Sequence, residues 1–223
     1  DMPVANTAPT APSLSANRVA ENAARGTVVG TLSASDADGD ALSYALTNSA
    51  GGRFALVTSG GVTRLVVNGA LDHETAASHT VTVAVSDGQG HQTTRSLSIA
   101  VTDVNEAPRI TSHGAADTAR LTHAENAGNV TRLIAQDVDE GASLTWSISG
   151  GADRSLFAIN AQTGALTFRD APDFEAPSDA GRNNVYDVTV SVSDGRLSDR
   201  QALAIRVTDQ EGKTLNGNVR ANS

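Results

Sequence analysis

Cysteine is absent from this chain of 223 residues. A disulfide framework and a thiolate metal site are therefore both excluded, although an extracellular protein can do without disulfides when a metal ion holds it together. Aromatic residues make up only 3% of the sequence and charged residues 18%, whereas glycine is frequent, at 20 residues. This composition favours short strands joined by turns.

Basic residues are also scarce. The chain has 16 Lys and Arg against 25 Asp and Glu, which gives a formal net charge of -9. Because binding to nucleic acid needs a basic face, nucleic acid is excluded as a partner. No hydrophobic run approaches the roughly 18 residues that span a bilayer, so no membrane insertion is expected.

The first residues lack the features of a signal peptide. Met2 is interpreted as the native start, and no basic segment followed by an apolar segment surrounds it. Export would then depend on a signal elsewhere in the chain.

Motifs of catalysis are missing as well. The sequence contains no Gly-x-Ser-x-Gly, no His-Glu-x-x-His and no phosphate-binding glycine loop. The five histidines are scattered, and His73, His79 and His91 lie beside turn or strand-end residues, so we expect them on the solvated surface. We therefore predict that the protein is not an enzyme.

Short segments of alternating apolar and polar residues dominate what is present. Residues 80–86, Thr-Val-Thr-Val-Ala-Val-Ser, are the clearest example. The first half contains about seven such segments, and glycine or acidic turns separate them. No helical period is found. This pattern predicts an all-β fold, a seven-stranded Greek-key β-sandwich of immunoglobulin-like architecture.

The second half of the sequence repeats the first. Ala124-Glu125-Asn126 matches Ala20-Glu21-Asn22, Asp137-Val138-Asp139 matches Asp36-Ala37-Asp38, and later motifs follow in the same order. We therefore predict two tandem sandwiches. The first covers residues 1–104 with an N-terminal lead-in, the second covers 105–212, and a polar tail covers 213–223. The second repeat also carries an insertion at 176–185.

Acidic residues mark the ends of strands on both sides of the repeat boundary. Strand ends of an antiparallel sandwich meet at its two poles, so these side chains should gather there. Carboxylates about 5 Å apart repel by roughly 1 kcal/mol per pair even in water. Ca²⁺ binds six to eight oxygen ligands, and about three ions would bring eight carboxylates close to neutrality. The eight are Glu21, Asp72, Glu74, Asp103, Glu106, Asp137, Asp139 and Asp194.

As an ordered set, these motifs resemble the cadherin repeat over nearly the whole chain. They are Ala-Glu21-Asn, Leu-Asp72-His-Glu74, Asp103-Val-Asn-Glu-Ala-Pro, Asp137-Val-Asp139 and Ser-Asp194-Gly. The resemblance implies an outer ion on Glu21, Asp72, Glu74 and Glu106. It implies a middle ion on Glu21, Glu74, Asp103, Glu106, Asp139 and the carbonyl of Val104. A third ion would bind Asn105, Asp137, Asp139, Asp194 and the carbonyl of Ala107.

The two outer ends of the tandem pair are expected to differ. Asn6-Thr-Ala-Pro9 has the spacing of Asn105-Glu-Ala-Pro108, so one further ion of the third type could bind there. At the far end no Asn and Pro follow the acidic residues, so tight binding is not expected. Other aspartates are interpreted as turn residues that bond their own backbone. The further site comprises Asn6, Asp36, Asp38 and Asp87, the far-end residues are Glu125, Asp173, Glu175, Asp209 and Glu211, and the turn residues are Asp40, Asp117 and Asp179.

The Asp-Val-Asn-Glu-Ala-Pro junction, a Gly-Gly-Ala-Asp-x-x-x-Phe segment and the lack of cysteine resemble the rhizobial adhering proteins. These are small calcium lectins of two cadherin-like repeats. The resemblance implies a monomer exported by a type I route to the cell surface or medium, where it binds acidic exopolysaccharide or capsule. Ca²⁺ would make the two repeats a rigid rod. The insertion at 176–185, which includes Arg182 and Asn183-Asn184, is either a candidate sugar contact or a plain loop extension. Alternatively, the chain is a spacer pair from a longer adhesin stalk or a homophilic cell-cell adhesion module.

Overall fold

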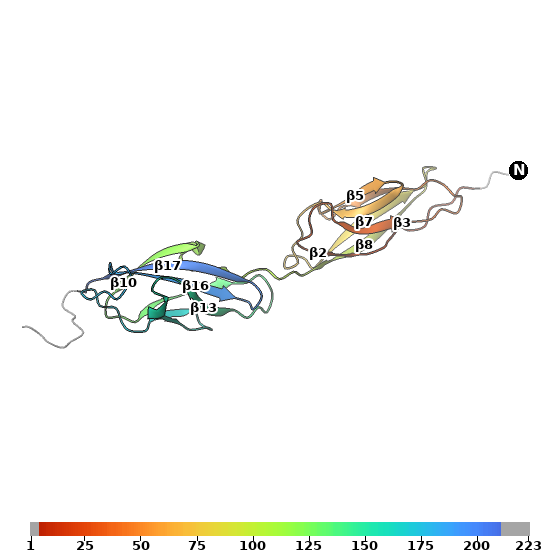
Figure 1. Ribbon diagram of the computed structural model, residues 1–223. Helices are drawn as coiled ribbons and strands as arrows, with labels where there is room; N and C mark the ends of the chain where they lie inside the picture. Colours follow the sequence, from red (N-terminus) through yellow and green to blue (C-terminus); the bar gives the residue numbers. More distant parts are fainter. Residues whose placement is uncertain (1–4, 211–223) are drawn as a thin grey trace, which may run out of the picture. The chain divides into compact units, whose positions relative to one another are not determined.

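The computed structural model describes residues 5–210, so the interpretations of Met2, Glu211 and the tail at 213–223 lie outside the described residues. The chain folds into two compact units that divide between Val104 and Asn105 (Figure 1). Within the described range, no helix has the length and hydrophobicity needed to cross a membrane.

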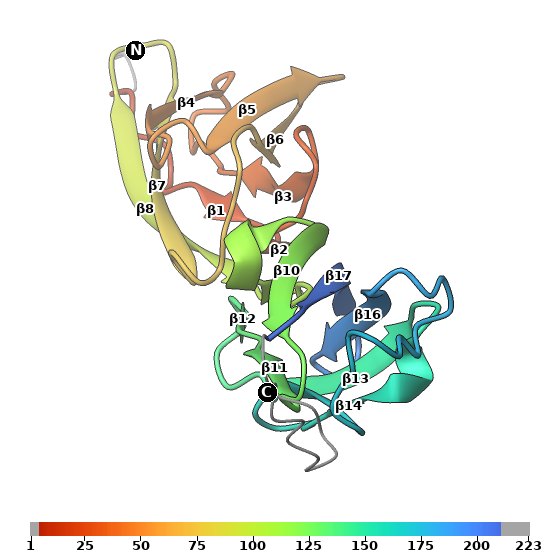
Figure 2. The ribbon, with the colours of Figure 1, turned by 90° about the vertical axis from the view of Figure 1, so that its left-hand side faces the viewer.

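Unit 1 is a sandwich of two four-stranded sheets. Figure 2 shows β7 and β8 on one side of the unit and β3, β5 and β6 on the other. Neighbouring strands are antiparallel, except that β2 runs parallel to β8. The first sheet has the order β1 (Ser13–Leu14), β3 (Val28–Ser33), β6 (Val62–Val67), β5 (Phe54–Ser59), and the second β2 (Arg18–Ala20), β8 (Gln92–Thr102), β7 (Ser78–Ser86), β4 (Ser43–Asn48).

The first strand of unit 1 is split between the two sheets. β1 pairs with β3 in one sheet, and β2 pairs with β8 in the other. Gly30 of β3 lies against the crossing segment, because a Cβ at this position would approach the Ala16 carbonyl oxygen to 2.5 Å. Counting β1 and β2 as one strand gives the predicted seven.

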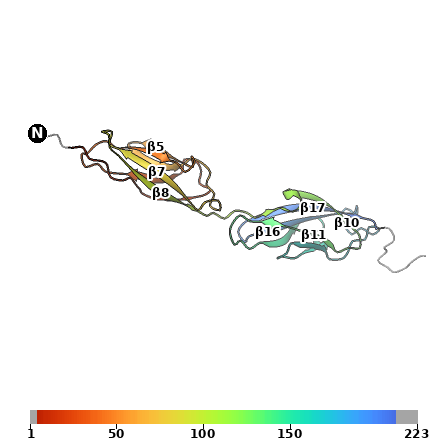
Figure 3. The same cartoon turned by 180° about the vertical axis from the view of Figure 1, so that it is seen from behind.

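Unit 2 is built in a similar way, except that the strands facing its four-stranded sheet divide into a sheet of three and a sheet of two. Figure 3 labels β10, β16 and β17 of the four-stranded sheet. β10 runs parallel to β17, as β2 does to β8, and two short 3₁₀ turns are the only helical segments that the structure describes, η1 (Ser112–Ala115) and η2 (Arg154–Leu156). The predicted all-β fold of two tandem Greek-key sandwiches is confirmed. The sheets are β10 (Thr118–Ala124), β17 (Ser198–Thr208), β16 (Val185–Ser193), β13 (Thr145–Gly150); β11 (Asn129–Arg132), β15 (Ala165–Phe168), β14 (Phe157–Ile159); and β12 (Ala135–Gln136), β9 (Arg109–Ile110).

Each unit has its own core, built from the inward positions of the alternating segments. Val81, Val83 and Val85 of β7 are fully buried, as the period of two requires. In unit 2 the aromatic rings of Phe157, Phe168 and Tyr186 pack together, and Trp146, which is 5% exposed, belongs to the same core.

The expected surface position of the histidines is wrong for His123, which is only 8% exposed. It is also wrong for His79, which is half-buried. Its ring packs edge-on against Phe54, with 6.1 Å between the centroids, and its Nε2 is buried without a hydrogen-bond partner in the described structure. Burial, with a smaller effect from Arg53, lowers the pKa of His79. The folded state therefore resists protonation of this ring.

Unit 1 is expected to lose stability as the pH falls. Because the pKa of His79 is lower in the folded than in the unfolded chain, the unfolded state binds more protons below about pH 6.5, and folding weakens there. Thermal melts of a His79→Phe variant between pH 7 and pH 5, at saturating calcium, should show a smaller acid-induced fall of the midpoint than the wild type. Equal falls in both proteins would contradict this assignment.

The insertion at 176–185 is held down by two buried carboxylates. Asp153 accepts hydrogen bonds from the N–H groups of Ala180 and Asp187, both at 2.7 Å. Asp179 accepts from the N–H groups of Asn183 and Asn184, both at 3.0 Å, which confirms its interpretation as a turn residue. The inserted loop is thus tied to the start of β16.

Candidate metal centres

At the end of unit 1 where the chain leaves β8, acidic side chains converge. The parallel register of β2 and β8 pairs Ala20 with Thr102, so the residues that follow the two strands emerge side by side. Glu21 and Asp103 are these residues, and Glu74 joins them from the loop between β6 and β7. The three, called here the Glu21 cluster, each offer a carboxylate oxygen within 4.8 Å of the others.

Backbone N–H groups orient Glu21. The N–H of His73 donates to its Oε2 and the N–H of Val104 to its Oε1, both at 2.7 Å. The bond from His73 is the largest cause of a lowered pKa of Glu21, which outweighs the effect of burial. Glu21 is 6% exposed, so an anionic carboxylate is fixed in a protected position.

Repulsion among the carboxylates of the Glu21 cluster affects the pKa of Glu74. A bond from its own N–H acts to lower the pKa of Glu74, but burial and the charges of Glu21 and Asp103 raise it overall. His73 lies beside the cluster, with Nδ1 2.8 Å from the Val101 carbonyl oxygen, and this bond with the neighbouring carboxylates raises its pKa. The cluster therefore carries negative charge that a cation would relieve.

Asp72 is not among the grouped carboxylates of the described structure. Its Oδ1 accepts the N–H of Thr75 at 2.9 Å and its Oδ2 accepts the Thr75 hydroxyl at 2.8 Å. Asp72 thus caps the local turn, and its part in binding an outer ion stays a prediction.

A second group lies at the start of unit 2. Asp137, Asp139 and Asp194, called here the Asp137 cluster, offer oxygens within 4.8 Å of one another. The amide of Asn105 donates to Asp194 at 2.7 Å and to the Glu106 carbonyl at 2.8 Å. The N–H of Glu106 donates to Asp139 at 3.0 Å. The predicted third ligand set is therefore assembled within this unit, and Ala107 follows it directly in the chain.

The oxygens of this cluster fit a hard cation. Asp137 Oδ2 and Asp139 Oδ1 are buried and have no hydrogen-bond donor in the described part of the chain. Hydrogen bonds from the N–H groups of Arg196 first, then from Asn105 and Leu197, lower the pKa of Asp194. Buried carboxylate oxygens without donors are costly unless a cation pairs with them, and a set of oxygen ligands alone suits Ca²⁺.

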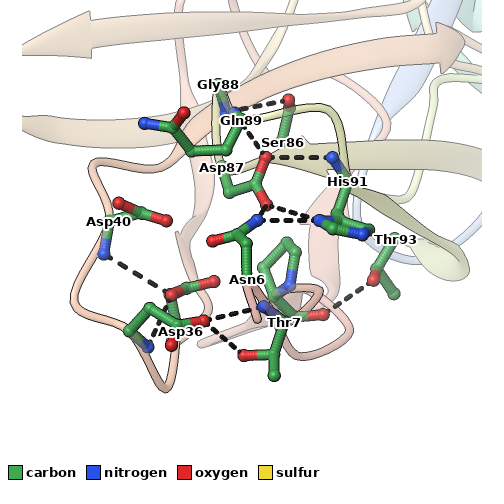
Figure 4. Close-up of polar contacts among 12 residues, drawn as sticks. Asn6, Thr7, Asp36, Asp40, Ser86, Asp87, Gly88, Gln89, His91 and Thr93 are labelled. Carbon is green, nitrogen blue, oxygen red and sulfur yellow. Dashed lines mark hydrogen bonds and ion pairs between the residues drawn. The ribbon is translucent and has the colours of Figure 1, made fainter. Parts of the chain in front are cut away.

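The N-terminal end of unit 1 has a related arrangement (Figure 4). The Asn6 amide donates to Asp87 at 2.8 Å, as Asn105 does to Asp194, and lies 2.7 Å from His91 Nδ1. Thr7 binds Asp38 through its N–H at 2.8 Å and its hydroxyl at 2.6 Å. The four residues predicted for an additional ion, Asn6, Asp36, Asp38 and Asp87, thus lie at one end of the unit.

Two features of this end escaped the sequence analysis. Asp40, interpreted as a turn residue, has a carboxylate oxygen within 4.8 Å of those of Asp36 and Asp38. Burial and then the charge of Asp36 raise the pKa of Asp40. His91 lies 3.3 Å from Asp87; burial acts to raise the pKa of Asp87, but bonds from Gln89, Asn6 and His91 lower it to about 2.

The end of unit 2 reproduces the Glu21 cluster. Glu125 accepts the N–H of Phe174 and the N–H of Gln210, both at 2.9 Å, as Glu21 accepts those of His73 and Val104. Oxygens of Glu125, Asp173 and Glu175 lie within 4.8 Å of one another. The sequence analysis discounted these residues because no Asn and Pro follow them, yet their side chains are arranged alike.

Comparisons with known proteins support the fold. Residues 16–102 match the sequence model described as "Cadherin domain". The chain is 32% identical over 203 residues to the protocadherin-like wing polarity protein stan of Drosophila melanogaster, which covers 86% of this chain and 6% of that protein. It is 37% identical over 102 residues to halomucin of Haloquadratum walsbyi, covering 44% of this chain and 1% of halomucin.

Among solved structures, the chain is similar to human protocadherin-24 EC1-2, with 25% identity and a TM-score of 0.67 over 89% of this chain and 99% of that one. The expected cadherin-like repeats are supported by this similarity and by the match of residues 16–102. The chain spans only a small part of the curated relatives named above. The resemblance to rhizobial adhering proteins stays a prediction.

Proposed function

We propose that this chain, whose repeats are cadherin-like, is an extracellular adhesion module that Ca²⁺ makes rigid. The buried oxygens of Asp137 and Asp139, which accept no hydrogen bond from the described part of the chain, carry this proposal, because they are available as ligands of a cation. The raised pKa of Glu74 supports it from unit 1.

The chain's own residues would hold the ions in two adjoining sets. Asp103, Val104, Asn105 and Glu106 are consecutive, so the ligands that each unit provides are tethered through the shortest possible connection. Calcium would supply positive charge and a demand for many oxygens. Three ions at this junction, with the ligands that the cadherin resemblance implies, and one at the Asn6 end are the proposed complement.

The proposed ligand of the module is an acidic exopolysaccharide or capsule of bacterial cells, reached after secretion by a type I route. A chain of net charge -9 repels an acidic polymer unless Ca²⁺ bridges the two or arginines gather locally. Calcium-dependent attachment to cells follows directly from the first route. In the second route, attachment depends on calcium only if Ca²⁺ holds the binding surface in shape.

Homophilic adhesion is a second candidate, and the similarity to protocadherins favours it. Sedimentation velocity with and without Ca²⁺ separates the two candidates. A calcium-dependent dimer of the purified chain supports homophilic adhesion, whereas a monomer under both conditions supports recognition of a different ligand.

Removing one junction carboxylate should weaken calcium binding. Asp139→Asn keeps the size of the side chain but removes a charge from the Asp137 cluster, so we expect at least one calcium affinity to fall about tenfold or more in a calorimetric titration. Attachment to polysaccharide-coated cells should fall in parallel.

The matched control is Asp117→Asn, which removes the same charge outside the clusters. It should leave calcium binding and attachment unchanged. Cell attachment that persists in chelator, or that Asp139→Asn leaves intact, would contradict the coupling of calcium to adhesion.

A further inference from the structure

Figure 1 labels β10, β17 and β16, which are neighbours in one sheet of unit 2. A groove lies on the outer face of these three strands. Its volume is about 610 Å³, within the range of sites that bind small ligands. The groove lies on described residues of unit 2 alone. None of the carboxylates in the metal clusters lines it.

Cross-strand register builds this groove. Ala202 of β17 pairs with Thr118 on one side and Thr189 on the other, and Ala204 pairs with Arg120 and Asp187. Two alanine side chains therefore form the floor of a channel between longer polar side chains. The surface is hollowed along β17 because Ala202 and Ala204 carry only methyl groups, whereas the side chains on β10 and β16 are longer.

The corresponding face of unit 1 has different residues. Leu97, Ile99 and Val101 of β8 match Leu203, Ile205 and Val207 of β17 in position, so Ser96 and Ser98 stand where unit 2 has its two alanines. Thr80 and Thr82 stand where unit 2 has Asp187 and Thr189. The two alanines and the charged residues beside them are thus found on unit 2 and not on the matching strands of unit 1.

The walls can serve as ligand contacts. Arg120 and Asp187 are both exposed, and the described structure shows no ion pair or hydrogen bond on the guanidinium or the carboxylate. The Arg120 guanidinium offers several hydrogen-bond donors, and the Asp187 carboxylate across the groove offers acceptors. Thr118 and Thr189 place hydroxyl groups in the next cross-strand row. Together these groups suit the neighbouring hydroxyls of a sugar ring. The apolar face of such a ring can lie on the two alanine methyl groups.

The charged side chains around the groove indicate which class of sugar it would bind. Arg200 and Arg206 flank the alanines on β17, and by the alternation of a strand they lie on the same face as the groove. Three arginines against Asp187 make this face basic in a protein of net charge -9. A saccharide that carries carboxylates is therefore favoured over a neutral one.

The far wall is fixed in place before any ligand binds. Gly151, with φ of +99°, lies so close to β16 that a Cβ would approach the Asp187 carbonyl oxygen to 2.3 Å. The Asp153 carboxylate accepts hydrogen bonds from the N–H of Asp187 and from the N–H of Ala180, so it links β16 to the insertion. A rigid wall lowers the entropy lost on binding, and the exposed Arg182 lies on the loop attached to it.

We propose that this groove is the site where unit 2 binds one uronic-acid residue of an anionic polysaccharide, with Arg120 and Asp187 contacting the sugar across the alanine floor. This inference rests on the proposed function and specifies its sugar site.

The test uses the full chain at saturating calcium, with a short oligogalacturonate as the anionic probe and a maltooligosaccharide of equal length as the neutral one. Amide chemical shifts should change on β10, β16 and β17 with the anionic probe only. Ala204→Leu, which fills the floor, and Arg120→Ser should each weaken binding about tenfold or more. The matched controls Ser98→Leu and Arg18→Ser, on the equivalent sheet of unit 1, should bind as the wild type does.

Binding of wild-type strength by Ala204→Leu, or shift changes confined to other surfaces, would overturn the groove but leave polysaccharide recognition standing. Stronger binding of the neutral probe would overturn the anionic assignment. Failure of the wild type to bind either probe would overturn both the groove and the polysaccharide ligand. The calcium titration of Asp139→Asn is independent of every sugar, so it still tests the calcium module.

Discussion

Removing calcium is expected to lower the thermal midpoint of the protein by more than about 10 °C. An ion present at a hundredfold its Kd stabilises the folded state by about 2.7 kcal/mol, and 1 kcal/mol shifts the midpoint of a 100-residue domain by about 4–8 °C. The repulsion among Glu21, Glu74 and Asp103 also returns when the cation leaves. Calorimetry in excess calcium and in excess chelator measures the difference.

Two controls separate specific binding from general screening of charge. Sodium chloride weakens carboxylate repulsion but fills no site, so it should restore only a small part of the lost stability. Magnesium should also restore less than calcium, because it requires near-ideal octahedral geometry and keeps its water. Equal midpoints in calcium and in chelator would show that the clusters do not bind the ion in solution.

Replacing Asp153 with alanine is expected to destabilise unit 2 by about 3–5 kcal/mol. Asp153 is 4% exposed, and its two oxygens accept the N–H groups of Ala180 and Asp187. Each hydrogen bond to a charged group contributes about 1.5–3 kcal/mol, and the alanine variant leaves both N–H groups without acceptors. Urea unfolding followed by fluorescence measures the loss in unit 2, because Trp146 is the only tryptophan of the chain and lies in that core.

Two control variants distinguish the loss of the Asp153 hydrogen bonds from the loss of a negative charge. Asp170→Ala removes the same charge from an exposed position of unit 2 and should change stability by less than about 0.5 kcal/mol. Asp153→Asn keeps one acceptor oxygen and should fall between the two variants. A small effect of Asp153→Ala would mean that the inserted loop holds its place without this carboxylate.

The sandwiches could be predicted because most of the large inward side chains on the long strands recur with a period of two. The run at 80–86 becomes β7 with its valines buried, and the repeated motifs locate the second unit. The grouping of Asp137, Asp139 and Asp194 was also predictable, since strand ends gather at the poles.

His79 shares the phase of the buried Val81, Val83 and Val85 on β7, so the alternation itself indicates the inward face, where its ring meets Phe54. Other features depend on tertiary contacts that no local pattern reveals. Asp40 joins Asp36 and Asp38 through the fold of one loop. The groove needs the register between three strands, two of them far from β10 in the sequence, so alanines at 202 and 204 carry no signal alone.

The most direct test of the central claim is NMR relaxation of backbone amides in both units, with and without calcium. If shared ions join the units, β7 and β16 should report one common rotational correlation time at saturating calcium and two shorter ones in chelator. Independent tumbling of the two units at saturating calcium would contradict the claim.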